Sequence, residues 1–100
     1  MISEVFEISN RIYFGFTPEF VILKILERAK KNGKKSLTIR EIVNQSSLSR
    51  KKVYNTLSKL EAKDFIKKYS DHHDSRKKRI EITLIGCKEI TEAIKEYARL

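Results

Sequence analysis

The chain is poor in the residues that build disulfide frameworks, thiolate metal sites and phosphate-binding loops. Its 100 residues include one cysteine, one proline, three glycines and no tryptophan. One cysteine excludes an internal disulfide and a CxxC pair, and the isolated glycines form no GxGxxG or P-loop motif. Apolar runs such as Phe20–Leu23 fall far below the roughly 20 residues of a membrane span, and no signal-peptide pattern precedes them. We therefore expect one soluble, cytoplasmic domain over residues 1–100, with no cofactor and no metal site.

Basic charge is concentrated in the middle of the chain. Lysine and arginine total 22 against 13 aspartates and glutamates, which gives a net charge of +9. Residues 50–80 carry 11 basic and 4 acidic side chains, whereas residues 81–100 carry 3 and 4. Such a surplus attracts polyanions, namely DNA, RNA or an anionic membrane surface. The 13 isoleucines, 15 lysines and single glutamine are typical of a thermophile, and an AT-rich genome gives the same bias.

The first third of the chain contains two helix patterns. Residues 1–16 place apolar side chains three and four positions apart, which indicates an amphipathic helix. Many of these residues also favour β structure, so an extended arm is the alternative. The Thr-Pro-Glu sequence at 17–19 combines a hydroxyl N-cap, a proline at the first helical position and a carboxylate beside the positive helix end. A helix is therefore predicted from Pro18 to about Lys31, where an Asn-Gly pair ends it.

Two short helices are predicted next. Thr38 and Glu41 have the spacing of a capping box, which predicts a helix over Ile39–Gln45. A Ser-Ser pair then interrupts the pattern, and Ser49 is the N-cap of the following helix. Two helices with so short a connection are a helix-turn-helix.

The second of these helices has one apolar and one polar face. At ~100° per residue, Val53, Leu57 and Leu60 share the buried face, with Thr56 at its edge. The opposite face is polar, so it can contact phosphates and base edges together. The basic first turn lies at the N-terminus of the helix, where the unpaired backbone N–H groups favour anions. A solvated basic face is the alternative for this helix taken alone. The candidate DNA contacts on it are Arg50, Lys51, Lys52, Tyr54, Asn55, Ser58 and Lys59.

A charged β-hairpin follows. Residues 65–69 and 80–84 read as its strands, and the second strand alternates between apolar and polar positions. The residues expected to point inward from that strand are Ile80, Ile82 and Leu84. The tip over 71–79 has no apolar residue to anchor it, so it must project into solvent or onto a partner. Its expected phosphate contacts are Lys77, Lys78 and Arg79.

A last helix is predicted from the N-cap Thr83 to Leu100. Its apolar residues recur at spacings of three and four, which is typical of a coiled-coil-like seam. The members of this seam are Cys87, Ile90, Ile94 and Tyr97. Cys87 is expected to be a small buried apolar residue, with a disulfide across a dimer as the alternative.

In their order along residues 37–89, these motifs resemble the MarR family of winged helix-turn-helix DNA-binding regulators. The residues that carry the resemblance are Thr38, Leu48, Ser49, Arg50, Leu57, Leu60, Glu61, Asp71, Asp74, Arg76, Ile82, Thr83 and Gly86. In size the chain is similar to short members from archaea and their viruses. The resemblance implies a mainly α fold with a small β-hairpin, which forms the wing. Helices flank the wing at both termini. Residues 17–84 would form the winged-helix core, 1–16 an N-terminal helix or arm, and 85–100 a C-terminal dimerisation helix.

The resemblance also implies roles within the wing. In that family a wing aspartate orients an arginine that enters the minor groove, and these roles fall on Asp74 and Arg76. A guanidinium held by a carboxylate is preorganised, and narrow A·T-rich minor grooves attract arginine. The chain departs from the family by having Asp64 where glycine is common before the first wing strand. It is also short, which implies less room for the ligand pocket that many relatives have.

The leading hypothesis is a homodimeric transcription regulator that binds double-stranded DNA. The expected dimer contacts are the terminal apolar residues Ile2, Val5, Phe6, Ile12, Tyr13, Ile90, Ile94 and Tyr97. These stripes alternatively close the core of the monomer itself. A non-regulatory DNA-binding protein of replication or chromatin, and a winged helix used for protein contact, are the other hypotheses. An enzyme is not expected, because adjacent His72 and His73 in a loop tip lack the spacing and the buried surroundings of a catalytic metal site.

Overall fold

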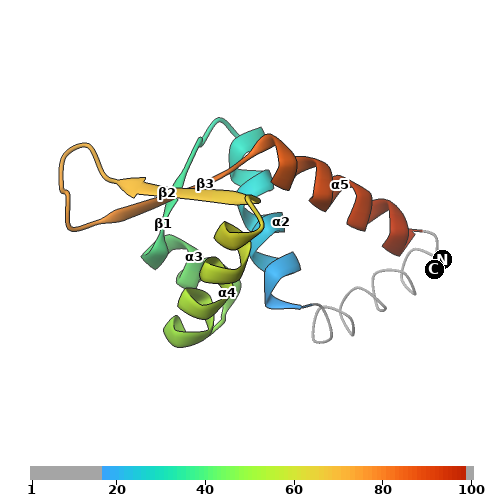
Figure 1. The fold of residues 1–100 in the computed structure, drawn as a ribbon, viewed down its shortest axis with the longest axis horizontal. Coiled ribbons are helices and arrows are strands. Elements are labelled where there is room, and N and C mark those ends of the chain that lie inside the picture. Colours follow the sequence, from blue (N-terminus) through green and yellow to red (C-terminus); the bar gives the residue numbers. More distant parts are fainter. Residues whose placement is uncertain (1–16, 99–100) are drawn as a thin grey trace.

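The computed structural model describes residues 17–98, which form four helices and three strands. In chain order the elements are α2 (Pro18–Lys31), β1 (Leu37–Thr38), α3 (Ile39–Ser46), α4 (Arg50–Ala62), β2 (Ile66–Ser70), β3 (Lys78–Ile82) and α5 (Leu84–Ala98). Figure 1 shows the hairpin of β2 and β3 projecting from one side of the body, whereas α5 extends from the opposite side. The predicted mainly α winged helix-turn-helix is thus confirmed. The helix or arm predicted over residues 1–16 lies outside the described residues.

Hydroxyl side chains cap the starts of α2, α3 and α4 as predicted. Thr17 Oγ1 accepts the N–H of Phe20 at 3.2 Å, and Ser49 Oγ accepts the N–H of Lys52 at 3.1 Å. The capping box of α3 is complete, because Thr38 Oγ1 accepts the Glu41 N–H at 3.1 Å and Glu41 Oε1 accepts the Thr38 N–H at 2.8 Å. These bonds satisfy amides that a helix start leaves unpaired, so they fix where each helix begins.

The sheet is antiparallel, with strand order β1-β3-β2. β1 pairs with the middle of β3, where Leu37 lies opposite Ile80 and Thr38 opposite Arg79. β2 pairs along all of β3, from Ile66 opposite Ile82 outward to Ser70 opposite Lys78. β3 is therefore the central strand. Its pairing with β1 attaches the hairpin to the residues that lead into the helix-turn-helix.

The core lies where α2 meets α3, α4, α5 and β3. The large side chains that are almost fully buried there are Ile22, Leu37, Ile42, Val53, Leu57, Leu60, Ile80, Ile82 and Ile90. Each such burial stabilises the fold by about 1.5–3 kcal/mol relative to an exposed position. Cys87 is a free, half-buried cysteine that packs against this core, so it is less buried than expected, and a disulfide across a dimer stays the alternative.

The expectation for Leu84 is wrong. Its side chain is 81% exposed, because β3 ends at Ile82 and Leu84 is the first residue of α5 rather than a strand residue. The alternation of the strand was extrapolated across a boundary at which the period changes from 2 to 3.6. The first wing strand likewise begins and ends one residue later than expected, at Ile66 and Ser70.

Hydrogen bonds join the turn after α4 to the start of α5. Thr83 Oγ1 donates to the Asp64 carbonyl at 2.6 Å and accepts the Gly86 N–H at 3.0 Å, which is the predicted cap. The Thr83 N–H donates to the Phe65 carbonyl at 3.0 Å. Asp64 itself adopts the left-handed conformation, with φ of 62°, at the position where the resembling family commonly has glycine.

Candidate nucleic-acid interface

α4 divides into the two faces that its sequence predicted. Val53, Thr56, Leu57 and Leu60 are buried against the body. The Thr56 hydroxyl donates to the Lys52 carbonyl at 2.7 Å, which satisfies its polar group without a solvent contact. All seven candidate DNA contacts on this helix are exposed: Arg50, Lys51, Lys52, Tyr54, Asn55, Ser58 and Lys59. The helix therefore presents an uninterrupted polar and basic face.

The first turn of α4 concentrates positive charge at the helix start. It contains no acidic residue, and it carries three consecutive basic side chains that begin at Arg50. Positive side chains at the positive end of the helix dipole do not stabilise the isolated helix. The same arrangement favours a bound anion, because the dipole and the side chains then attract it together.

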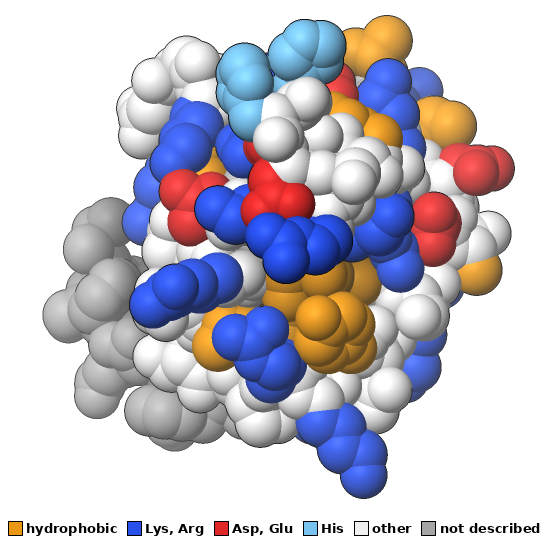
Figure 2. All heavy atoms as spheres, turned by 90° about the vertical axis from the view of Figure 1, so that its left-hand side faces the viewer, with side chains coloured by type: hydrophobic (Ala, Val, Ile, Leu, Met, Phe, Trp, Pro, Cys, Tyr) orange, Lys and Arg blue, Asp and Glu red, His pale blue; other side chains and the backbone are white. Residues whose placement is uncertain are grey.

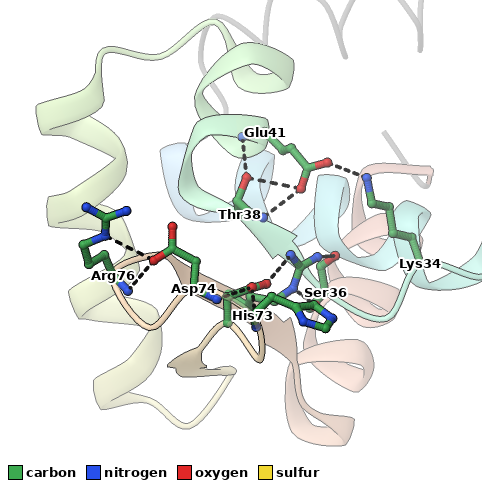
Figure 3. Close-up of polar contacts among 9 residues, drawn as sticks. Lys34, Ser36, Thr38, Glu41, His73, Asp74 and Arg76 are labelled. Atoms are coloured by element: carbon green, nitrogen blue, oxygen red, sulfur yellow. Dashed lines mark hydrogen bonds and ion pairs between the residues drawn. The ribbon is translucent and has the colours of Figure 1, made fainter.

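Two aspartates organise the tip of the wing. Asp71 Oδ2 accepts the N–H groups of His73 and Asp74, both at 3.0 Å. Asp74 Oδ1 then accepts the N–H of Arg76 at 3.1 Å and its Nε–H at 3.2 Å. Figure 3 shows these bonds following one another around the turn. A segment without any apolar anchor is thus held by carboxylates instead.

The contact between Asp74 and Arg76 has the geometry that the family resemblance implied. The Arg76 side chain is 90% exposed, while its Nε–H is fixed by the carboxylate, so the guanidinium projects from the wing. A preorganised arginine loses less side-chain freedom when it binds a groove or a phosphate. Asp71 supports the same turn in its charged form. The His73 N–H, together with the Arg79 guanidinium, holds the pKa of Asp71 below its usual value.

Arg79 differs from the other basic residues of the wing. It lies in β3, opposite Thr38 and Tyr69, and its side chain is only 25% exposed. Its guanidinium donates to the Oγ and the carbonyl oxygen of Ser36 and to Asp71 Oδ1. Sequence reasoning did not single out Ser36, because it lies 43 residues from Arg79 and no local pattern connects the two.

Lys77 and Lys78 are exposed on the outer part of the wing, as expected. Lys78 Nζ donates to Ser70 Oγ across the hairpin at 3.2 Å. His72 and His73 are also exposed, and their rings meet edge to face with centroids 5.2 Å apart. Figure 2, which looks onto the wing end of the molecule, shows lysine and arginine side chains distributed over this face with a few carboxylates between them.

The residues expected at a dimer interface are described only in part. The five N-terminal ones, Ile2, Val5, Phe6, Ile12 and Tyr13, lie outside the described residues, as does the side chain of Tyr97. Ile90 is 1% exposed within the single chain and packs in its core, so for this residue the alternative, a role in the monomer core, holds. Ile94 is half-buried against the same core.

A small cavity of about 180 Å³ lies between the start of α2, the end of α4 and α5. Phe20, Phe65 and Ile90 line it, together with the ion pair between Lys63 and Glu19, whose Nζ and Oε2 are 3.4 Å apart. Pockets that enclose drug-sized ligands usually have volumes of about 300–1,000 Å³.

Among the residues the structure describes, no helix is long and apolar enough to cross a membrane.

The fold and this surface define a winged helix-turn-helix regulator, and comparisons with known proteins identify its family. Residues 15–95 match the family model described as transcriptional regulator SarA/Rot. The chain therefore belongs to the SarA/Rot family of transcriptional regulators. Comparison with curated protein sequences gives no match.

Solved structures give the same fold. Staphylococcus aureus MepR in complex with DNA is 28% identical, with a TM-score of 0.68 over 99% of this chain and 80% of that one. MepR in its DNA-binding conformation is 27% identical, with a TM-score of 0.71 over 99% and 77%. The PcaV regulator of Streptomyces coelicolor, solved with its natural ligand, is 16% identical, with a TM-score of 0.74 over 98% and 71%, and shows the fold alone. The MarR-like resemblance is thereby confirmed, whereas an archaeal or thermophilic origin stays a prediction.

Proposed function

We propose that this protein is a cytoplasmic homodimeric transcription regulator that binds specific sequences in double-stranded DNA, with no catalytic step. In this proposal α4 lies in the major groove and the wing reaches the minor groove. The observation that carries it is the pair of exposed reading surfaces: the polar and basic face of α4, and Arg76 held outward by Asp74. The existence of a MepR complex with DNA supports the same mode of action.

The two surfaces differ in the information they can read. Asn55 and Ser58 on α4 can donate to and accept from base edges, which the major groove presents in a distinct pattern for each base pair. Arg76 can read the width of the minor groove, since its charge is attracted by narrow A·T-rich segments. Lys52 and Lys77 carry charge without the planar guanidinium of arginine and suit phosphate contacts, which fix the register of the protein on the duplex.

Dimerisation is proposed through α5 and the apolar residues of segment 1–16. α5 extends from the body on the side opposite the wing, so two copies joined there would keep both α4 helices available to DNA (Figure 1). Half-sites would then be spaced about one helical turn, ~10 bp, in a pseudo-palindrome. Ile94 and Tyr97 are the proposed contacts on α5, and Ile90 is left to the monomer core.

The test is the salt dependence of binding to a duplex recovered by genomic footprinting. If the basic residues neutralise phosphates, the logarithm of affinity falls linearly with the logarithm of salt, with a slope of about −0.9 for each phosphate. A flat response would refute DNA binding as the function and favour a winged helix used for protein contact. A footprint without sequence preference would instead favour a replication or chromatin protein.

Two variants test the reading surfaces separately. Asn55→Ala should relax preference at one or two base pairs by about 1–3 kcal/mol each, and uniform weakening would mean that Asn55 touches only the backbone. Arg76→Ala should weaken binding most at A·T-rich flanks, and equal loss on every flank would refute minor-groove reading by this residue. Lys88→Ala is the matched control, because it removes one exposed positive charge from α5, outside both surfaces.

A further inference from the structure

We propose that Arg79 is a positioning residue that anchors the tip of the wing to the body and thereby places Arg76, rather than a phosphate contact. This inference rests on the proposed function, because Arg76 must be the residue that enters the minor groove. It assigns the two wing arginines different tasks. Arg76 reads DNA, and Arg79 holds the turn that presents Arg76.

The contacts of Arg79 join three parts of the sheet. From the central strand β3, its Nε–H donates to Ser36 Oγ at 2.7 Å and its Nη2 donates to the Ser36 carbonyl at 3.1 Å. Its Nη1 donates to Asp71 Oδ1 at 3.1 Å, just beyond the end of β2. All three guanidinium nitrogens therefore donate to protein oxygens, in the planar geometry that arginine provides and lysine does not.

Arg79 and its two partner residues are also shielded from solvent. Ser36 is 7% exposed, and the side chains of Arg79 and Asp71 are 25% and 15% exposed. If the Arg79 guanidinium turned away to meet a phosphate, Asp71 Oδ1 and the Ser36 carbonyl would lose its N–H groups. Charged hydrogen bonds in such partly buried surroundings are stronger than exposed ones, so the geometry favours the internal role.

The anchor continues to Arg76 without interruption. Asp71, fixed by Arg79 through Oδ1, uses Oδ2 to accept the N–H groups of His73 and Asp74. Asp74 in turn holds the N–H and Nε–H of Arg76. Figure 3 shows this chain of hydrogen bonds leading from Ser36, in the body, to the exposed guanidinium of Arg76. Loss of the Arg79 guanidinium therefore loosens the turn that holds Arg76 in position.

Arg79→Lys tests the proposal in DNA binding, because it keeps the positive charge and removes the planar guanidinium that bonds Ser36 and Asp71 together. Affinity for an operator with A·T-rich flanks should fall about tenfold, with little loss on G·C-rich flanks and an unchanged salt slope. In an Arg76→Ala background the same substitution should have no further effect, since the residue it positions is gone. Wild-type affinity of Arg79→Lys, or a loss that adds to that of Arg76→Ala, would overturn the proposal.

Lys77→Ala is the matched control within the wing. Its exposed side chain fits a phosphate contact, so its loss should be uniform across flanks, should reduce the salt slope by about 0.9 and should add to that of Arg76→Ala. Arg79→Ala, by contrast, should behave like Arg79→Lys in flank selectivity. If Arg79→Ala instead lowered the salt slope as Lys77→Ala does, Arg79 would be a phosphate contact after all.

Amide hydrogen exchange of the free protein separates this proposal from DNA binding. The N–H groups of His73 and Asp74 should exchange about tenfold faster in Arg79→Lys, with unchanged exchange in α4 and in Lys77→Ala. Wild-type exchange rates in Arg79→Lys would refute the anchor whatever the affinity for DNA. Faster exchange in a protein that binds no duplex would leave the anchor standing and refute the proposed function.

Discussion

Gly86→Ala tests how closely α5 packs on the turn that follows α4. Gly86 is buried in the first turn of α5. A Cβ atom there would lie 2.2 Å from the Phe65 carbonyl oxygen and 2.8 Å from Cγ1 of Ile82. The Phe65 carbonyl cannot turn away freely, because it accepts the Thr83 N–H at 3.0 Å. α5 would have to move outward by about 1 Å to restore ordinary van der Waals separation.

Two effects of opposite sign determine how much Gly86→Ala changes the free energy of unfolding. Alanine has a higher helix propensity than glycine, by about 1 kcal/mol. Overpacking costs about 1–3 kcal/mol, and loss of the hydrogen bond between Thr83 and Phe65 costs about 1 kcal/mol more. Because the obstacle is backbone rather than a flexible side chain, we expect the steric cost to win, with a net destabilisation of about 1–3 kcal/mol.

Urea and thermal unfolding measure this difference. For a domain of this size each kcal/mol shifts Tm by about 4–8 °C, so the variant should melt at least several degrees below wild type. Ile85→Ala is the control, since it changes the neighbouring residue of the same turn, which is 56% exposed. A Gly86→Ala protein as stable as wild type, or more stable, would show that helix propensity dominates and that the close approach to Phe65 carries no cost.

Three further predictions concern the scaffold. Asp64→Gly should raise stability by about 0.5–1 kcal/mol, because glycine adopts φ of 62° without a Cβ penalty, and a lower Tm would contradict this. Thr38→Ala should lower stability by about 0.5–2 kcal/mol through loss of the α3 cap, and an unchanged urea midpoint would exclude that role. Burial acts to raise the pKa of Glu27, but the hydrogen bond from Lys31 and the charge of Lys24 outweigh it, and the pKa is lowered. Since the folded pKa lies below the unfolded value, the contribution of Glu27 is complete above the ordinary glutamate pKa and is lost as pH falls through the lowered folded pKa. Urea midpoints at neutral and acidic pH should show this fall less steeply in Glu27→Gln, and equal slopes would count against it.

Local signals were sufficient to predict most of the fold. Thr17, Thr38 and Ser49 each cap the helix that their sequence context indicated, because capping depends only on residues within one turn. The two faces of α4 were equally legible, since buried Val53 and Leu57 recur at the helical period. The exposed face could thus be named residue by residue before any tertiary contact was known.

Contacts between distant segments were not predictable in this way. Arg79 was grouped with the phosphate contacts because its neighbours in sequence are charged, yet its partner Ser36 precedes β1. Leu84 was given a buried position because strand alternation cannot show where a strand ends. Asp64 adopts a left-handed conformation that its residue type alone does not predict, and the sequence indicated it only through the glycine that the resembling family commonly has there.

The strand order also bears on whether the sheets of two molecules can pair edge to edge. With β3 in the centre, β1 and β2 are the two edges of the described sheet, and an exposed strand edge can pair with another molecule. β1 has two residues and is too short to serve as a template, whereas β2 has five. Lys67 is exposed in β2, so a second copy that paired antiparallel about this residue would place two lysines opposite each other, whereas Lys68 points to the other face and is paired with Glu61. A neutral residue in place of Lys67 would therefore lower the barrier to edge-to-edge aggregation.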